Sequence, residues 1–216
     1  MFVDVIPNRP FRPPAVTAKD TLLEAAVKLI RSNGFAATSV DQLCAEAGVT
    51  KGAFFHHFAS KEALGVAAAD YWSASTAAFF AEAPFHALPD PVDRVLGYLD
   101  LRIALIGGPP EAFSCVAGTL VQEAFRSSAA IRMAAEASIM GNARTLEADI
   151  DAAIAQCGVS GTTGASLARH VQAVIQGAFV LAKTQPEECA ASLAREQLAH
   201  LRRYFAMLFG RENQEE

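Results

Sequence analysis

A short run of hydrogen-bond donors stands at the start of a helix expected over residues 51–57. Thr50 is suited to cap that helix, and Lys51 and Gly52 follow directly. Because a helix in the major groove of DNA presents only its first turns to the base edges, Lys51, Gly52 and Ala53 are the candidates for reading sequence. The side chains expected to hold phosphates are Thr38, Ser39, Thr50, His56 and Lys61.

Capping signals predict the elements that position these residues. Ser39, with Gln42 three residues later, predicts a helix over residues 40–47, and Gly48 permits the left-handed backbone that ends it. Ser60 is suited to cap a further helix. Two short helices joined by a glycine turn are typical of a helix-turn-helix that binds DNA. An isolated Lys or His is more often a solvated side chain, so the interpretation depends on the whole string.

The whole string makes the interpretation specific. The segment GVTKGAFFHHFASKEAL, residues 48–64, resembles the signature of tetracycline-repressor (TetR) family regulators, G-V-[ST]-x-G-x-[LF]-Y-x-H-F-x-[SN]-K-x-x-L. The resemblance covers roughly Thr17 to Trp72 and extends to the rest only in layout. Phe55 takes the place of the usual Tyr at a DNA-binding position, which removes a hydrogen bond to phosphate. The resemblance implies a repressor that binds a double-stranded DNA operator as a homodimer and responds to an unidentified small-molecule effector.

Composition and charge are compatible with this interpretation. The formal net charge is -5, but seven of the 18 Lys and Arg residues and six of the 23 Asp and Glu residues lie in residues 1–65, so that segment carries +1 and the remainder -6. The asymmetry has the sign expected for DNA binding but is small, so the motif carries the argument. Apolar residues make up 52% of the chain, which predicts that some apolar surface lies in a subunit interface.

An all-α fold follows from the richness in alanine and leucine and from apolar residues at helical spacing. Proline and glycine divide the chain, and beside the two short helices they leave predicted helices at residues 17–32, 60–83, 91–106, 113–125, 128–156, 163–184 and 186–209. The predicted domains are a flexible arm at 1–16, a three-helix helix-turn-helix DNA-binding domain at 17–63, a larger helical effector-binding and dimerisation domain at 64–210 and a tail at 211–216.

The last two predicted helices carry broad apolar stripes. Two such helices from each of two chains can form a four-helix bundle, and the resemblance implies a homodimer built in this way. The alternative is that both stripes face the core of their own chain. The residues expected at the dimer interface are Val171, Val174, Ile175, Ala178, Leu201, Phe205 and Leu208.

Large apolar residues of the middle helices can line a cavity for a small molecule, although each is more often plain core. The candidates are Trp72, Phe79, Phe113, Cys115, Gln122, Met140, Gln176 and Phe179. Cys115 lies in SCVAGTL, which is similar to the G-C-x-x-G-x-L segment of TetR relatives that respond to electrophiles, with Ser114 in place of Gly. The sequence shows no nearby cation that would activate this thiol unless Arg102 or Arg126 folds close, so an inert buried thiol is the alternative.

Other functional classes have little support. The chain contains no G-x-S-x-G, G-x-G-x-x-G, Walker loop or H-E-x-x-H, so no enzyme, cofactor or metal site is predicted. Four scattered cysteines fit reduced thiols, and neither a secretory signal nor a run of about 20 apolar residues is present, so a cytoplasmic protein without membrane contact is expected. The runner-up is a helical interaction or adaptor protein without sequence-specific DNA binding, which leaves the three capped helices unexplained.

Overall fold

The computed structural model describes residues 17–211, and within that range the chain forms ten α-helices, one short 3-10 helix and no strand. The predicted all-α fold is therefore confirmed. The elements are α1 (Ala18–Asn33), α2 (Val40–Ala47), α3 (Lys51–His57), α4 (Lys61–Ala81), η1 (Pro84–Ala87), α5 (Pro91–Ala104), α6 (Pro110–Phe113), α7 (Val116–Ala124), α8 (Ala129–Cys157), α9 (Gly164–Ala182) and α10 (Glu187–Leu208). The arm predicted at residues 1–16 and all but the first residue of the tail predicted at 211–216 lie outside the described residues.

The predicted caps start the first four helices. In the reciprocal pair before α2, the backbone N–H of Gln42 donates to Ser39 Oγ at 3.2 Å and the N–H of Ser39 donates to Gln42 Oε1 at 2.8 Å. Thr50 and Ser60 cap α3 and α4 by accepting the backbone N–H of Ala53 and of Ala63, each at 3.1 Å, without a reciprocal bond. Gly48 ends α2 with φ of 66°, a left-handed conformation that L side chains rarely adopt. These local hydrogen bonds fix the residues at which α2 ends and at which α3 and α4 begin.

The helix predicted at residues 113–125 is present as α7 but begins three residues later than predicted, and a separate short helix, α6, precedes it. The helix α6 ends at Phe113, Ser114 and Cys115 are extended, and α7 begins at Val116. Cys115 caps α7, since its Sγ accepts a hydrogen bond from the N–H of Gly118 at 3.4 Å. A thiol is a weak acceptor and is not among the usual capping side chains, so no capping pattern indicated this helix start.

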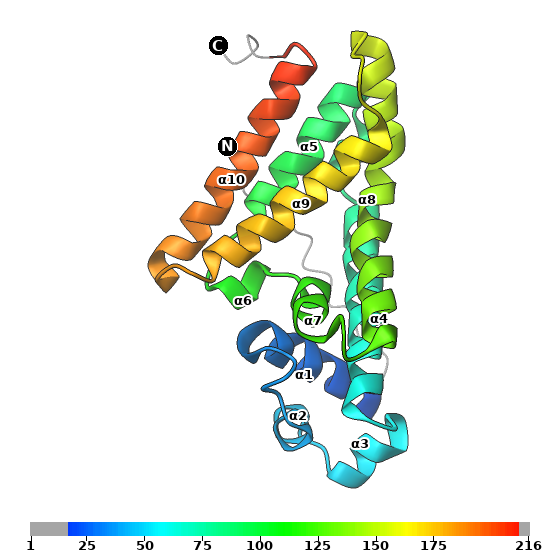
Figure 1. The fold of residues 1–216 in the computed structure, drawn as a ribbon, viewed down its shortest axis with the longest axis vertical. Helices are drawn as coiled ribbons and strands as arrows, with labels where there is room; N and C mark the ends of the chain where they lie inside the picture. Colours follow the sequence, from blue (N-terminus) through cyan, green and yellow to red (C-terminus); the bar gives the residue numbers. More distant parts are fainter. Residues whose placement is uncertain (1–16, 212–216) are drawn as a thin grey trace.

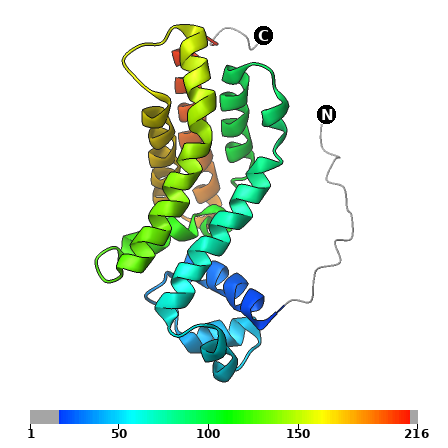
Figure 2. The same ribbon diagram turned by 90° about the vertical axis from the view of Figure 1, so that its right-hand side faces the viewer.

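The helices pack around two hydrophobic cores. The helices α1, α2 and α3 gather at one end of the molecule, and α5, α9 and α10 lie toward the other (Figures 1 and 2). The first core unites α1 to α3 with the start of α4, with α7 and with the first turns of α8, whereas the second joins α5, α8, α9 and α10. The helix α4 contributes Leu64 and Ala68 to the first core and Phe80 to the second. The domain boundary predicted between residues 63 and 64 thus falls inside one continuous helix and stays a prediction.

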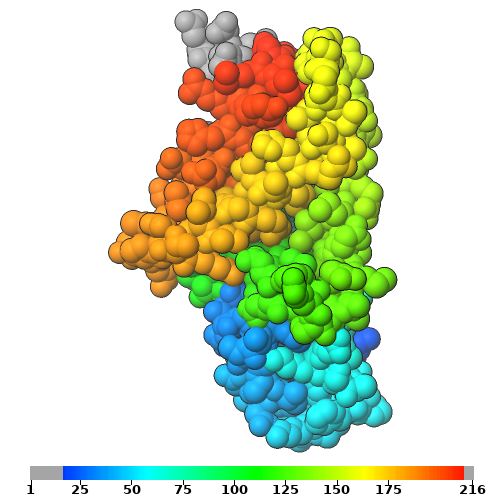
Figure 3. Space-filling model, viewed as in Figure 1, coloured from blue at the N-terminus to red at the C-terminus, as the bar shows by residue number. Residues whose placement is uncertain are grey.

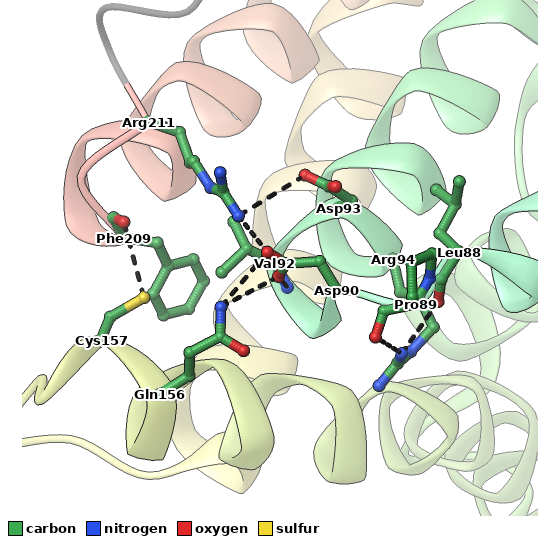
Figure 4. Close-up of polar contacts among 10 residues, drawn as sticks. All are labelled: Leu88, Pro89, Asp90, Val92, Asp93, Arg94, Gln156, Cys157, Phe209 and Arg211. Carbon is green, nitrogen blue, oxygen red and sulfur yellow. Dashed lines mark hydrogen bonds and ion pairs between the residues drawn. The ribbon is translucent and has the colours of Figure 1, made fainter.

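A polar cluster ties three helix ends together far from α3. Asp90 caps α5 by accepting from the N–H of Val92 at 2.8 Å, and it also accepts from Gln156 Nε2 on α8 at 3.2 Å and from Arg211 after α10 (Figure 4). Burial alone would raise the pKa of Asp90, but these hydrogen bonds and the Arg211 charge lower it overall. The cluster therefore anchors the end of α10 to the second core. No helix between residues 17 and 211 is long and apolar enough to cross a bilayer.

Candidate DNA-binding surface and effector cavity

The N-terminal turn of α3 presents the predicted base-reading residues to solvent. Lys51 and Gly52 are exposed and Ala53 is partly exposed, whereas Phe54 is completely buried behind them. A Cβ added at Gly52 would meet only Thr50 Oγ1, at 3.7 Å, so the backbone here is open to a close partner. Lys51 Nζ lies 2.7 Å from Asp41 Oδ1, and the hydrogen bond and charge of Asp41 raise the pKa of Lys51. Because both side chains are largely exposed, this ion pair is weak and a phosphate or base can displace it.

The other predicted contacts flank this turn. Phe55 is 56% exposed, although it is a large apolar side chain, and it packs edge-on against Phe54 with ring centroids 5.1 Å apart. His56 is exposed beside it. Ser39 and Thr50 are exposed as well, but each hydroxyl oxygen already accepts the N–H that begins a helix. They can still donate their hydroxyl protons outward.

Two predicted phosphate contacts have internal partners instead. Thr38 is only 1% exposed, and its hydroxyl donates to the carbonyl of Gly34 at 2.7 Å, so the prediction that its side chain contacts DNA is corrected. Lys61 Nζ donates to the carbonyl of Ala36 at 3.1 Å and lies 4.6 Å from the centroid of the Phe35 ring. Burial lowers the pKa of Lys61. Both side chains stabilise the turn between α1 and α2, and a phosphate role for Lys61 stays a prediction.

Glu123 on α7 holds the same turn and was not predicted from the sequence. Its Oε2 accepts the backbone N–H of Ala36 at 2.6 Å, while Lys61 binds the carbonyl of that residue. The contact spans 87 residues in sequence, and no local pattern could have revealed it. Glu123 also lines a cavity of about 230 Å³ between α7 and α9. One carboxylate thus joins a cavity wall to the turn that carries α2.

Seven of the eight predicted effector residues lie around adjoining cavities. A cavity of about 260 Å³ is lined by Trp72, Phe79, Phe113 and Phe179, and the 230 Å³ cavity by Cys115, Gln122, Gln176 and Phe179. A smaller cavity of about 50 Å³ shares walls with both. Met140 lines none of these three cavities, since α8 presents Ser138, Ile139 and Asn142 to them instead.

Polar side chains that were not predicted as a group also line these cavities. Arg102 Nε donates to Tyr98 Oη and Arg102 Nη2 donates to Asn142 Oδ1, both at 2.8 Å. Gln172 Nε2 donates to the same Asn142 oxygen at 2.6 Å. Arg31 and Lys183 add two more cations to the walls. They come from α1 and from the end of α9, so only the folded chain brings them together.

Cys115 is partly exposed and lines two of the cavities. Arg102 reaches the small cavity with it, whereas Arg126 lies over the ring of Phe125. The structure adds two cations absent from the prediction, since Arg31 and Lys183 both interact electrostatically with Cys115. Cys44 is buried, and Cys157 and Cys189 are exposed. Cys115 is therefore the cysteine that lines these cavities.

The predicted dimer-interface residues mostly face their own chain. Val171, Ile175, Ala178, Leu201 and Phe205 are buried in the second core, and Val174 and Leu208 pack against it. The dimer assignment is corrected for the five buried residues, because each helix buries its most apolar side against a neighbouring helix of the same chain, and it stays a prediction for the partly buried Val174 and Leu208. The helices α9 and α10 form a broad face of the molecule (Figure 3). Their outward side carries Ala173, Gly177, Leu181, Tyr204 and Met207, all exposed.

Comparisons with known proteins agree with this fold. Residues 22–68 match the model for "Bacterial regulatory proteins, tetR family". Two uncharacterized HTH-type transcriptional regulators of Bacillus subtilis are similar over the N-terminal region: YerO is 41% identical over 54 residues and YuxN 39% identical over 51, which are 25% and 24% of this chain. The alignments span 19% and 18% of the lengths of those two relatives, so they concern the DNA-binding region alone.

Solved structures resemble the chain over most of its length. A TetR-family regulator from Agrobacterium tumefaciens has a TM-score of 0.70 at 22% identity, covering 85% of this chain and 96% of that one. A TetR regulator from Chloroflexus aurantiacus has a TM-score of 0.74 at 24% identity, covering 88% of this chain and 94% of that one. The reduced form of E. coli NemR has a TM-score of 0.72 at 23% identity, covering 85% of this chain and 94% of that one. At these identities the likeness establishes the shared fold. Residues 22–68 therefore match the DNA-binding region of TetR-family transcriptional regulators, and the chain as a whole has the all-α fold of these solved TetR-family structures.

Proposed function

We propose that this protein is a cytoplasmic repressor that binds a near-palindromic operator as a homodimer and leaves it when a small molecule or an electrophile occupies its cavity. The observation that carries the proposal is the first turn of α3. Its Lys51 and Gly52 are exposed, with Lys51 in a weak ion pair to the exposed Asp41, while Phe54 and Phe58 bury the opposite side of the helix. A rigid helix with an open, positively charged start is suited to the major groove.

Dimerisation is proposed through the outward side of α9 and α10. Ala173 and Gly177 are small and exposed, and a Cβ at Gly177 would meet nothing within 4 Å, so a second helix can approach closely. Tyr204 and Met207 supply apolar area on α10. Two chains joined here would present two α3 helices to half-sites about one helical turn, roughly 34 Å, apart.

The effector is proposed to act through α7. The cavities lie between α7 and the helices α4 and α9, and α7 carries both Cys115 at its start and Glu123 near its end. A ligand or a covalent adduct at Cys115 would displace α7 and with it the Glu123 contact to Ala36. The effector shifts the equilibrium only by its differential affinity for the DNA-binding and released states.

Selection of bound fragments from the source genome would test the DNA-binding proposal. We expect recovery of a two-fold symmetric sequence, with an affinity for it that falls steeply as salt rises because phosphate contacts release counterions. An adaptor protein would recover no common sequence. An affinity that stays flat from low to moderate salt would contradict the phosphate contacts.

Two matched lysine variants would then test the role of α3. Lys51 and Lys28 are both exposed and each pairs with one carboxylate, at 2.7 and 2.6 Å. Lys51→Ala should reduce discrimination at one base-pair position about tenfold, whereas Lys28→Ala should leave base preference unchanged. Equal losses on operator and random duplexes for Lys51→Ala would refute a base-reading role.

A further inference from the structure

The walls of the three adjoining cavities carry an excess of positive charge in a chain that is acidic as a whole. Their charged lining residues are the cations Arg31, Arg102 and Lys183 and the carboxylate of Glu123. The net charge of the chain is -5, so chance placement would favour carboxylates here. Glu111 also interacts electrostatically with Arg31 and Lys183 but is not among the lining residues of these cavities.

Within residues 17–211, none of the three wall cations, Arg31, Arg102 and Lys183, forms an ion pair within 4 Å, although Glu123 interacts electrostatically with Lys183. Arg102 is held by two hydrogen bonds to the neutral Tyr98 and Asn142. Arg31 stacks over the Trp72 ring at 4.8 Å, and its Nε is buried without a hydrogen-bond acceptor. Lys183 Nζ donates to the neutral Thr119 Oγ1 at 3.2 Å. Burial lowers the pKa of both groups, which is the cost of holding cations partly out of water.

A buried hydroxyl is a second, independent indication of a ligand-binding site. Ser114 is 1% exposed, lines the 230 Å³ cavity, and its Oγ has no hydrogen-bond partner among the described residues. Buried polar atoms almost always have a partner, so an orphaned hydroxyl in a cavity wall indicates that something polar binds there. A hydroxyl can donate to an anion, as can an ammonium and a guanidinium.

We propose that the effector is an amphipathic organic anion, whose charged group binds among Arg31, Lys183 and Ser114 and whose apolar body lies among Trp72, Phe113 and Phe179. This inference rests on the proposed function and names the chemical class of the effector. Trp72, Phe113 and Phe179 line the 260 Å³ cavity together with Arg31, so the charged and apolar parts of one molecule can be bound at once. Cys115 lies between the two regions and would contact the same ligand.

The site would also link the two halves of the chain. Arg31 belongs to α1 and the first core, whereas Lys183 directly follows α9 and the second core. An anion bound to both cations offsets their mutual repulsion and draws the end of α1 toward the end of α9. A neutral molecule in the same cavity would provide no such connection.

Paired probes that differ only in charge would test the proposal. Phenylbutyrate and its neutral isostere phenylbutyramide are titrated into the full chain without DNA, by calorimetry and by the emission of Trp72, the only tryptophan. The wild type should bind phenylbutyrate at least about tenfold more tightly than the amide, because charged hydrogen bonds form only with the acid. Neither probe is an electrophile, so the result is independent of Cys115 alkylation.

Single substitutions then test which residues cause the preference for the acid over the amide. Lys183→Met and Arg31→Met should each weaken phenylbutyrate binding about tenfold and leave phenylbutyramide binding within about twofold. Lys19→Met is the matched control, since Lys19 is an exposed lysine of α1 that lines none of these cavities, and it should change neither affinity. Ser114→Ala should fold normally, because it removes an unpartnered hydroxyl, and should weaken only the acid.

Three results would overturn the proposal: equal binding of acid and amide, an acid preference that survives in the Lys183→Met, Arg31→Met double variant, or no saturable binding of either probe. These outcomes are separate from failure of the proposed function. If the protein still binds its selected DNA fragment but prefers the amide, the proposed function stands and the proposal of an anionic effector is refuted. A chain that selects no fragment loses the function itself.

Discussion

Replacing Thr38 by Val separates a structural role from a DNA-binding role. Thr38 was predicted to hold a phosphate, but its hydroxyl donates to the Gly34 carbonyl at 2.7 Å and approaches the Leu29 carbonyl at 3.4 Å. Valine has nearly the same shape, so the change removes one good hydrogen bond and leaves a partly buried carbonyl without its donor. The expected loss is about 1 to 2 kcal/mol of unfolding free energy.

Thermal unfolding and a DNA titration on the same samples measure the two roles. For a chain of 216 residues, each kcal/mol corresponds to about 2 to 4 °C in the melting temperature, so Thr38→Val should melt several degrees lower. At a temperature where it is fully folded, its operator affinity should stay within about twofold of the wild type. Lys51→Ala should show the opposite pattern, because its side chain is exposed and contributes little to packing. An unchanged melting temperature with a tenfold loss of DNA affinity for Thr38→Val would refute the reasoning.

Four further changes are predicted. Asp41→Asn should tighten operator binding a few-fold at low salt, because it frees Lys51, and an unchanged titration would show that the ion pair does not compete with DNA. Glu in place of both Tyr204 and Met207 should give folded monomers in light scattering, whereas Phe205→Asp should prevent folding, and a persistent dimer in the double variant would exclude this interface. In brief alkylation followed by mass spectrometry, Cys115 should be labelled before the more exposed Cys157. The Cys115→Ser variant should still bind DNA but should not be released by electrophiles. Labelling of the cysteines in order of exposure alone would show that Cys115 is an inert thiol. Burial lowers the pKa of Lys183 in the folded state below the ordinary 10.5, so between those two pKa values the unfolded state binds more protons. The free energy of unfolding should therefore rise with pH in that window more steeply for the wild type than for Lys183→Met. Parallel pH dependences of the two proteins in urea unfolding would refute the assignment.

Interactions between residues close together in the sequence correctly predicted the starts of helices α2, α3 and α4. Ser39, Thr50 and Ser60 begin their helices because each hydroxyl binds an N–H only three residues away, and Gly48 ends α2 through its own backbone freedom. Such interactions depend on residues that the sequence already places together. The start of α7 was missed for a local reason, since a thiol replaces the usual hydroxyl or carboxylate cap.

Long-range contacts set the limit of the prediction. The apolar stripes of α9 and α10 were recognised, but a stripe reports only that a face is buried and not which chain buries it, so Phe205 was assigned to the wrong partner. The aromatic cavity residues were found by size and type. The cations Arg31 and Lys183 lie 152 positions apart in the sequence and meet only after α1 packs near the end of α9. The contact between Glu123 and Ala36 could not be predicted either, because 87 positions separate the two residues in the sequence.

The helix α4 belongs to both cores without a break. It has 21 residues, so at 1.5 Å per residue it is a rod about 30 Å long. The second half of α4 contributes Trp72, Thr76 and Phe79 to the cavity wall, and Leu64 in its first turn belongs to the same core as Phe54 of α3. A tilt of about 5° would swing one end by roughly 2.5 Å relative to the other, which is comparable to the length of a hydrogen bond. In the proposed function this rod would act as a lever, because the displacement at its α3 end grows with the number of helical residues between that end and the cavity.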